Sequence, residues 1–416
     1  MISDDTLGIC RRELLAFYHR ALARVNGRRV VADYLTATPL KGNWAVVAIG
    51  KAASAMAEGA QQSLGDRLQS GLLITRHSYA ERFPGSDRWQ IMESGHPLPD
   101  EASLAAGEAL LSYIDTLPDG LPLLFLLSGG ASALVEAVPE GVTLDDLIKA
   151  NDWLLASGLE IAQMNAVRRR LSRIKGGRLA CHLKGRRCLQ LLISDVPGDD
   201  PAVIGSAPLY PTAEIALPNM LPDWLDALLQ TAEVVPEVDD PLFATIETHI
   251  VADNALALQA AKEAAEEKGV TVYLQPGHFH GEAQELAQRF VQTLLQGPPG
   301  LYLWGGESSM KLPQLHGQGG RSQHLALVAA ELLAGREDIL LLAAGTDGSD
   351  GSGGDAGAVV DGSSKPRGEE EGVSLHMALI NADSGTFLAA SGDLIETGPT
   401  GTNVMDLVFG WKVGGD

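Results

Sequence analysis

Short apolar runs alternate with stretches of helical periodicity along the first half of the chain. The runs lie at residues 44–49, 71–75, 89–93, 121–127 and 189–193. Apart from 89–93, which contains Gln and Glu, they consist mostly of Val, Leu, Ile and Ala, which is typical of strands buried on both faces of a parallel sheet. Helical patterns lie at residues 51–64, 101–117, 143–156 and 161–183. This alternation predicts a doubly wound parallel sheet covered by helices on both faces.

A proline-rich stretch from residue 207 to 241 interrupts this pattern. It contains six prolines and no long helical periodicity, which indicates a domain boundary. A second α/β set follows, with strands expected at 249–252, 270–274, 301–304 and 339–343, and helices at 254–268, 282–295 and 322–333. We therefore expect an α/β protein with a parallel-sheet domain over 1–240 and a second, smaller α/β domain over 241–416.

Charge limits the classes of partner. The 416 residues include 31 basic and 53 acidic side chains, for a formal net charge of -22. This balance argues against nonspecific nucleic-acid binding, which depends on neutralising phosphates. Residues 161–190, however, hold nine Lys or Arg and no Asp or Glu. Most such runs are solvated helix faces, but here we expect one or two members to enter a site for an anionic ligand.

Cysteine usage and the N-terminus indicate a reduced, cytoplasmic protein. The three cysteines have no CxxC spacing, so they predict neither a disulfide framework nor a zinc site. No apolar run is long enough for a membrane span, and the chain begins with the acidic stretch MISDDT where a signal peptide is basic. The sequence leaves open whether the chain forms a homo-oligomer.

The run 189–193 ends in three carboxylates, Asp195, Asp199 and Asp200. Open α/β sheets place their ligands at the carboxyl ends of strands. Because unpaired buried charge is costly, these carboxylates need a metal ion, a cationic side chain or a substrate hydroxyl as partner.

Two other strand ends carry candidate anion-binding residues. A glycine loop after the run 121–127 suits a phosphate or carboxylate at a helix N-terminus, although a plain tight turn is the alternative. Its members are Ser128, Gly129, Gly130, Ala131 and Ser132. Lys51 follows the run 44–49 and precedes a helix, where a cation opposes the helix dipole. This suggests a ligand or carboxylate partner for Lys51, with a plain surface lysine as the alternative.

The second half and one loop of the first add weaker candidates. Glu307 follows a strand, and Arg321 opens a helix beside two glycines, where it suits bidentate contact with a phosphate or carboxylate. Asp347 follows the strand 339–343 and is a candidate metal ligand. His96, between a strand and a helix, is a candidate for substrate contact, although loop histidines are often incidental.

Several common catalytic motifs are missing from the sequence. It contains no GxxxxGK[ST], HExxH or GxSxG motif. Residues 351–356 match GxGxxA formally, but they lie several residues past their strand, so they are weak evidence for dinucleotide binding.

Taken in order, these blocks resemble the type II glycerate kinases, the family with the MOFRL domain. The blocks that carry the resemblance are GKAA (50–53), SGHPLPDE (94–101), LSGGASAL (127–134), NAVRRRLSRIKGGRLA (165–180), LISDVPGDDP (192–201), GGES (305–308), GGRSQHLAL (319–327), AAGTDGSDG (343–351) and GDLIETGPTGTNVMDL (392–407). They cover nearly the whole chain, so the match is much more specific than any single motif.

The resemblance implies a Rossmann-like N-terminal domain, a smaller MOFRL domain and an active site in the cleft between them. The implied reaction transfers the γ-phosphoryl group of ATP to the 2-hydroxyl of D-glycerate, with Mg²⁺, giving 2-phosphoglycerate. No membrane or nucleic-acid partner is implied. By this resemblance Lys51, Asp195 and Arg321 form the catalytic charged network.

We assign the remaining candidates as hypotheses within that mechanism. Residues 128–132, His96 and Glu307 would contact substrate or phosphate. Arg168 and Lys175, seven residues apart and expected on one helix face, would hold the substrate carboxylate. Asp195, Asp199 and Asp347 are the candidate metal ligands, and Asp195 could act instead as the base.

Four positions depart from the family pattern and keep open a protein that has lost catalysis, and a second alternative arises because the family has also carried the label of hydroxypyruvate reductase. The family usually has GGRNQE where this chain has Ser322 and His324, and VIGSGPT where it has Ala207 and Leu209. The alternatives are an NAD(P)H-dependent hydroxypyruvate reductase and a noncatalytic protein that binds sugar acids or phosphate.

Overall fold

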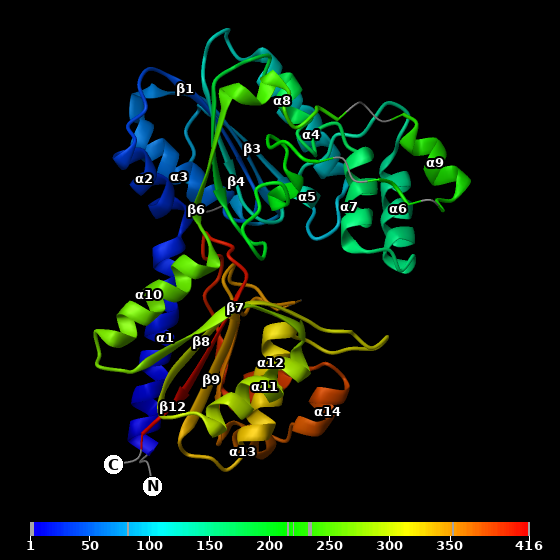
Figure 1. The fold of residues 1–416 in the computed structure, drawn as a ribbon. Coiled ribbons are helices and arrows are strands. Elements are labelled where there is room, and N and C mark those ends of the chain that lie inside the picture. The colour runs from blue at the N-terminus through cyan, green and yellow to red at the C-terminus, as the bar shows by residue number, and fades with distance from the viewer. Residues whose placement is uncertain are drawn as a thin grey trace. The chain divides into compact units, whose positions relative to one another are not determined.

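The apolar runs of the first half of the chain form neighbouring strands of one sheet (Figure 1). The computed structural model describes residues 4–80, 83–213, 216–218, 220–231, 235–351 and 353–414. The strands are β1 (Trp44–Ile49), β2 (Leu68–Arg76), β3 (Trp89–Ser94), β4 (Leu123–Leu127), β5 (Cys188–Ile193) and β6 (Ile246–Ala252), in the order β3-β2-β1-β4-β5-β6. Strands β1 to β5 pair in parallel, which confirms the predicted parallel sheet.

This strand order places a topological switch between β1 and β4. The chain builds outward from β1 to β3 and then returns to add β4 on the other side of β1. In open sheets of this kind, ligands bind beyond the carboxyl ends of the strands at the switch. The segments that follow β1 and β4 contain Lys51 and residues 128–132, so the fold puts these candidates where a ligand is expected.

Helices cover both faces of this sheet. They are α2 (Gly27–Ala37), α3 (Ala53–Leu64), α4 (Glu101–Thr116), α5 (Ala131–Leu134), α6 (Leu144–Ala156), α7 (Ile161–Arg170), α8 (Leu179–His182) and α9 (Asp223–Leu229), with 3-10 turns at Gly65–Arg67, Ile204–Ser206 and Pro241–Thr245. Ala45, Val47 and Ile49 of β1 share a core with α4. Because strand side chains alternate, the other face of β1 is left for α3, which contacts β1.

Helices α6, α7 and α9 group beside the sheet (Figure 1). They share a separate small core that includes Leu147 and Leu154 of α6, Val167 of α7, and Leu225 of α9. Helix α6 begins where Thr143 forms a capping box with Asp146, whose backbone N donates to the threonine Oγ1 at 3.2 Å.

The predicted helix over 161–183 is wrong. Helix α7 ends at Arg170, and α8 covers only Leu179–His182. Leu171 is the C-cap of α7, and between the helices Gly176 and Gly177 have φ values of 64° and 84°, a left-handed conformation that makes the connecting segment a turn. Lys175 therefore lies in a turn, so it does not share a helix face with Arg168.

The second sheet is mixed, in the order β11-β10-β9-β12-β8-β7. Its strands are β7 (Val272–Glu282), β8 (Gly300–Ser309), β9 (Ile339–Gly345), β10 (Gly357–Asp361), β11 (Leu394–Ile395) and β12 (Asp406–Lys412). Strands β7 and β8 pair in parallel, and the other neighbouring strands of this sheet pair antiparallel. The helices of this unit are α1 (Asp4–Val25), α10 (Asn254–Glu266), α11 (Ala283–Gln296), α12 (Arg321–Leu333), α13 (Ser364–Glu370), α14 (Leu375–Ile380) and α15 (Ser384–Ser391).

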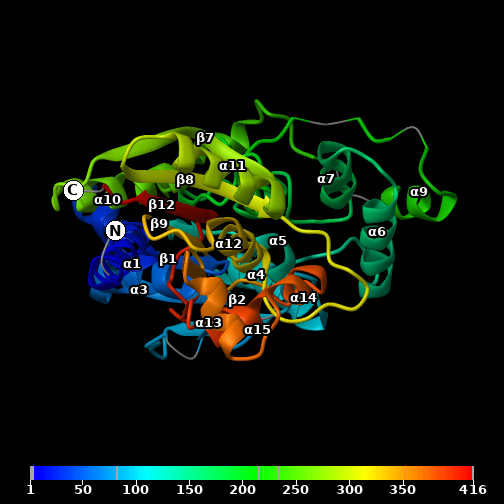
Figure 2. The same ribbon diagram turned by 90° about the horizontal axis from the view of Figure 1, so that it is seen from below.

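The expected α/β elements after residue 250 are confirmed, with one correction. The strand expected at 249–252 is part of β6, the last strand of the first sheet, and does not begin the second. Strands β10 to β12 and helices α13 to α15 had no prediction; α15 packs against both α13 and α14, and Figure 2 shows the three together.

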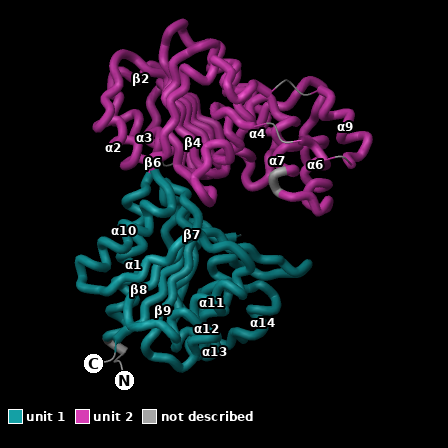
Figure 3. Tube along the Cα trace, viewed as in Figure 1, with its two compact units in different colours: residues 1–26, 252–416 teal, residues 27–251 magenta. Residues whose placement is uncertain are grey.

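The chain divides into two compact units, residues 27–251 and residues 1–26 with 252–416 (Figure 3). The division differs from the expected domains 1–240 and 241–416 mainly in the place of the first 26 residues. Helix α1 packs against α10, β9 and β12, and the buried Tyr18 hydroxyl donates to the Gly345 carbonyl at 2.7 Å. The expected position of the active site between the domains stays a prediction. Within the described ranges, no helix is long and apolar enough to cross a membrane.

Candidate functional site

The turn after β1 and the glycine loop after β4 are held together by backbone hydrogen bonds. The Lys51 N donates to the Gly129 carbonyl at 2.9 Å, and the Ala52 N donates to Ser128 Oγ at 3.0 Å. Ser128 is completely buried, so its side chain joins the two turns. Parallel pairing of β1 with β4 brings these two sequence candidates to one place.

Lys51 and His96 converge on Gly130. This glycine has a φ of 86°, and a Cβ there would lie 3.1 Å from both Lys51 Cγ and His96 Cδ2. A side chain at Gly130 would therefore crowd both groups. A cation and an imidazole beside a glycine loop form a site suited to an anionic group. Helix α5 has only four residues, so the expected helix-dipole contribution from this loop is small.

Arg168 is held by two asparagine side chains and, among the described residues, has no carboxylate partner. Its Nε donates to Asn151 Oδ1 at 2.9 Å and its Nη1 to Asn165 Oδ1 at 3.3 Å. Burial lowers the Arg168 pKa, and no carboxylate among the described residues offsets that effect. Two amides thus hold a half-buried guanidinium whose charge is available to a ligand.

Lys175 is already neutralised by a buried carboxylate. Its Nζ pairs with Glu136 Oε2, and Ser172 Oγ donates to Glu136 Oε1 at 2.5 Å. Both charged side chains are buried, so the pair is part of the interior. The sequence analysis missed Glu136, because 39 residues separate it from Lys175 and neither lies in a shared motif.

A cavity of about 330 Å³ adjoins these groups. Three predicted residues line it, Ser132, Arg168 and Lys175. Ser132 Oγ lies 2.7 Å from the Oγ of Ser206, another lining residue. Pro97, which follows His96, also lines the cavity, so the cavity begins next to the Lys51 and His96 cluster.

The three aspartates of the loop after β5 differ in burial and in hydrogen bonding. Asp195 is half-buried directly beyond the strand. Asp199 has a φ of 53°, and its Oδ1 is buried with no hydrogen-bond partner in the described part of the chain. Asp200 is exposed and accepts a hydrogen bond from Ala202 N at 2.9 Å. Asp199 is therefore the carboxylate here with an unmet demand for a donor or cation.

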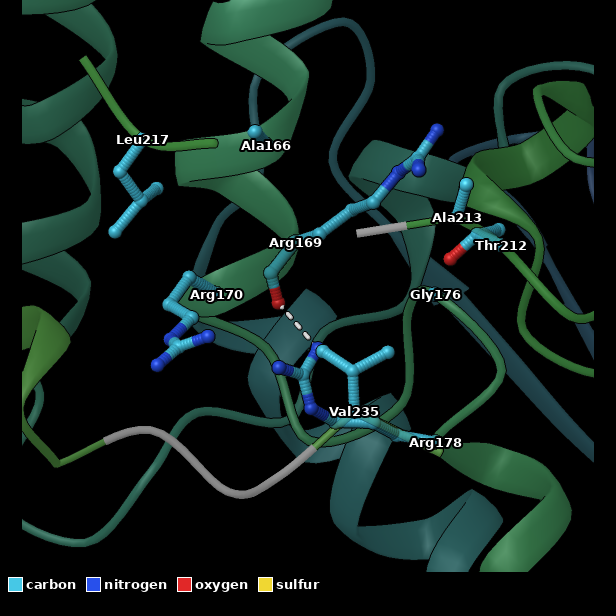
Figure 4. A pocket seen from close by; sticks show the side chains of 9 residues that line it. All are labelled: Ala166, Arg169, Arg170, Gly176, Arg178, Thr212, Ala213, Leu217 and Val235. Atoms are coloured by element: carbon cyan, nitrogen blue, oxygen red, sulfur yellow. Dashed lines mark hydrogen bonds between the residues drawn. The ribbon is translucent and has the colours of Figure 1, made fainter. Parts of the chain in front are cut away.

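Other arginines of the basic run serve the local structure (Figure 4). Arg178 is buried, and its Nη1 donates to the Arg169 carbonyl at 2.8 Å and to the Lys175 carbonyl at 3.3 Å. Arg169 Nη2 donates to the Ala202 carbonyl at 3.1 Å. These residues line a cavity of only about 30 Å³, and Figure 4 shows the side chains of Arg169 and Arg170 pointing away from each other. These contacts are consistent with the mixed role expected for the basic run. Arg178 has a structural role in it.

In the other unit, two carboxylates clamp Arg321. Its Nη1 pairs with Glu307 Oε1 at 2.6 Å, while Nε and Nη2 lie 3.2 and 3.3 Å from the two oxygens of Asp406. Antiparallel pairing places Asp406 of β12 opposite Gly306 of β8, next to Glu307. Asp406 was not predicted as a site residue, although it lies in the GDLIETGPTGTNVMDL block.

Burial and ion pairing shift the pKa values of this cluster in opposite directions. Burial raises the pKa of Asp406 to about 6, although Arg321 lowers it. Burial alone would lower the pKa of Arg321, but Asp406 and Glu307 raise it above its usual range. The guanidinium is thus fixed as a cation in one orientation.

Asp350 orients the start of α12. Its Oδ2 accepts from Gln323 N at 2.7 Å and its Oδ1 from Ser322 N at 3.2 Å, so it caps the helix that carries Arg321. Burial raises the Asp350 pKa to about 7 despite these bonds. Asp347 lies nearby in sequence after β9, and its Oδ1 accepts from Ser349 N at 3.0 Å.

The four residues that depart from the family pattern lie in different local environments. Ala207 has a φ of 52°, a conformation that favours the glycine usual in the family, and Leu209 is fully buried. Ser322 is buried at the start of α12, and His324 Nδ1 lies 3.1 Å from Ser384 Oγ. Burial lowers the His324 pKa. Position 352, within the weak GxGxxA match, lies outside the described residues.

Comparison with known proteins agrees with these observations. The family model described as a domain of unknown function, DUF4147, matches residues 13–221, and the MOFRL family model matches residues 300–406. The chain is 36% identical to D-glycerate 2-kinase of Thermotoga maritima, over 88% of this chain and 89% of that protein. It is also 36% identical to an Agrobacterium vitis protein named "Putative hydroxypyruvate reductase", over 95% and 93% of the two chains.

A solved structure gives the same result for the fold. The crystal structure of glycerate kinase from Thermotoga maritima superposes with a TM-score of 0.84 at 32% identity, and the match covers 98% of this chain and 100% of that one.

Proposed function

Because the chain belongs to the glycerate 2-kinase family with DUF4147 and MOFRL domains, we propose that it phosphorylates D-glycerate. The γ-phosphoryl group of ATP would pass to the 2-hydroxyl, giving 2-phosphoglycerate and ADP. The observation that carries the proposal is the convergence of Lys51 and His96 on Gly130, beside a cavity lined by Arg168, which has no carboxylate partner in the described ranges.

Phosphoryl transfer needs positioning and charge neutralisation more than covalent chemistry from the protein. In this proposal Lys51 neutralises charge on the transferring group, and the backbone of residues 128–132 allows a phosphate to approach closely. A bond forms between the substrate 2-oxygen and the γ-phosphorus, while the bond from that phosphorus to the bridging oxygen of ADP breaks. The hydroxyl proton leaves to a base, for which Asp195 is the candidate.

The acceptor carboxylate is assigned to Arg168. A guanidinium held by two amides and lacking a counter-ion suits a carboxylate in its fork geometry. Lys175 is a weaker candidate than the sequence indicated, because Glu136 already neutralises it. Arg321 supplies a second fixed cation, and Glu307, expected to contact substrate, holds Arg321 in place.

Mg²⁺ is the expected metal ion for ATP. Over the described residues, no group of three His, Cys, Asp or Glu side chains forms a metal site. Mg²⁺ needs only one or two carboxylates when substrate phosphates complete its shell, and the orphaned Oδ1 of Asp199 fits that requirement. Asp199 would hold the ion, Asp195 is the alternative ligand to its role as the base, and Asp347 is a further candidate. When bound, Mg²⁺ would supply charge neutralisation for the phosphates.

The reductase alternative has one structural observation in its favour, beside the Agrobacterium vitis relative that carries that name. The strand order β3-β2-β1-β4-β5-β6 is also that of dinucleotide-binding domains. The first strand-to-helix turn, however, reads Gly50-Lys51-Ala52-Ala53, with one glycine in place of the three that bring a helix close to a pyrophosphate. We therefore favour the kinase. A cytoplasmic location stays a prediction.

The test measures ADP release from ATP and Mg²⁺ with D-glycerate, against a control without acceptor, and separates 2- from 3-phosphoglycerate. We expect 2-phosphoglycerate. NADH oxidation with hydroxypyruvate in the absence of ATP would support the reductase instead. ATP and glycerate binding by folded protein without ADP release would support a noncatalytic role.

A further inference from the structure

The cavity beside Arg168 is larger than a three-carbon acid requires. Its volume of about 330 Å³ lies within the roughly 300–1,000 Å³ range of pockets that enclose drug-sized ligands. Its polar lining includes Arg168, Asn151 and Asn165, which together form a place for one carboxylate. Most of the remaining volume has no assigned occupant.

The same cavity has exposed apolar walls. Leu98, Leu155 and Val203 line it with exposed fractions of 66%, 67% and 43%. Covering apolar side chains of this size with an apolar surface lowers the free energy, because their surface is removed from water. Three of them around one anchored cation indicate a ligand with an acidic head and an apolar body.

We propose that this cavity is an acceptor subsite for 2-hydroxy acids that carry an apolar substituent beyond the third carbon. The carboxylate lies on Arg168, and the substituent covers the apolar walls. This inference rests on the proposed kinase function, because it names the substrate class of the same site. The phosphoryl step is unchanged: the 2-oxygen gains the phosphoryl group, ADP leaves, and the hydroxyl proton is released.

The local charges explain why a carboxylate binds at Arg168. Asn151 and Asn165 occupy Nε and Nη1, and within the described ranges Nη2 has no partner. Lys175 lines the same cavity, but its pair with Glu136 cancels its charge there. A ligand acid therefore meets one uncompensated cation, and its orientation is determined by that contact.

The experiment compares D-glycerate with D-2-hydroxybutanoate and D-2-hydroxy-4-methylpentanoate as acceptors for the full chain, at saturating ATP and Mg²⁺. Each methylene placed in an apolar pocket is worth about 10-fold or more in kcat/KM. We expect the six-carbon acid to exceed D-2-hydroxybutanoate by at least about 10-fold. Equal or lower values for the six-carbon acid would overturn the inference.

Two variants assign the effect to this cavity. Leu155→Ser should lower kcat/KM for the six-carbon acid about 10-fold and leave D-glycerate within about twofold. The matched control is Leu315→Ser, because Leu315 is 90% exposed and does not line the cavity. An equal loss in both variants, or an equal loss with both acceptors, would contradict the subsite.

Direct binding separates this inference from the kinase proposal. Calorimetric titration with D-2-hydroxy-4-methylpentanoate should show binding that Arg168→Met abolishes. If D-glycerate is phosphorylated and the six-carbon acid neither binds nor reacts, only the subsite fails. If no acceptor is phosphorylated but this binding is observed, the kinase proposal fails and the cavity remains a site for apolar acids.

Discussion

Replacement of Lys175 by Met tests whether this lysine serves the interior or the substrate. The substitution leaves Glu136 as a buried carboxylate without its cation. Breaking a buried ion pair from one side costs about 3–5 kcal/mol. Glu136 Oε1 keeps its bonds from Ser172 Oγ at 2.5 Å and Ala137 N at 3.1 Å, so we expect the lower value, about 3 kcal/mol.

That loss is large enough to measure by thermal unfolding. For a unit the size of residues 27–251, each kcal/mol shifts Tm by roughly 2–4 °C, so Lys175→Met should unfold roughly 6–12 °C earlier. Tryptophan fluorescence reports the transition, because Trp153 and Trp224 pack against the core of α6, α7 and α9. The double variant Lys175→Met with Glu136→Gln should recover most of the loss, since no unpaired charge remains.

The control is Lys184→Met, which removes an exposed pair with Asp115 and should cost less than about 1 kcal/mol. A Lys175→Met variant as stable as this control would refute the buried-pair reasoning. The double variant should also phosphorylate D-glycerate with KM within a few-fold of the parent. A large rise in KM in this stable variant would show that Lys175 contacts the substrate.

Three further predictions concern the cations and carboxylates of the two units. Lys51→Ala should remove most turnover and keep the unfolding midpoint, because the side chain lies beside Gly130 and outside the core; near-normal turnover would eliminate its assigned role. Asp406→Asn should lower kcat about 100-fold with a smaller change in KM, because Arg321 loses its bidentate partner and a displacement near 1 Å costs that much; an unchanged kcat would show that Arg321 needs no such support. The third concerns pH. The folded pKa of Asp350 is raised to about 7 from an ordinary value of 3.8, so its contribution to stability is full below pH 3.8 and lost as pH rises through 7. Between pH 5 and 8 the parent should lose roughly 3 kcal/mol that Asp350→Asn does not lose, measured by urea unfolding in EDTA; parallel pH profiles would contradict this.

Much of the first sheet could be predicted from the sequence, because a strand buried on both faces must be apolar throughout. The runs that became β1, β2, β4 and β5 largely satisfy that requirement within a few residues of their observed bounds, whereas the edge strand β3 contains Gln90 and Glu93 and is partly exposed. The positions of Lys51, residues 128–132 and Asp195 at strand ends followed from the same pattern. The break between α7 and α8 was also readable, since Gly176 and Gly177 adjoin in the sequence, but the basic residues around them maintained an apparent helical period.

Pairings between distant segments could not be predicted. Glu136 neutralises Lys175 across 39 residues, and Asp406 holds Arg321 across 85. Such contacts depend on which strands become neighbours and on their register. The pattern of apolar and polar residues along the chain specifies neither.

The sequence by itself therefore determined which segments are strands, where their polar ends lie and which family the blocks resemble. Only the tertiary structure decided that β6 is the last strand of the first sheet, that α1 packs with the C-terminal unit, and that Lys175 pairs with Glu136 while Arg168 has no carboxylate partner among the described residues. The physical reason is that burial and local periodicity act residue by residue along the chain, whereas the neutralisation of a charge depends on the groups that folding brings beside it.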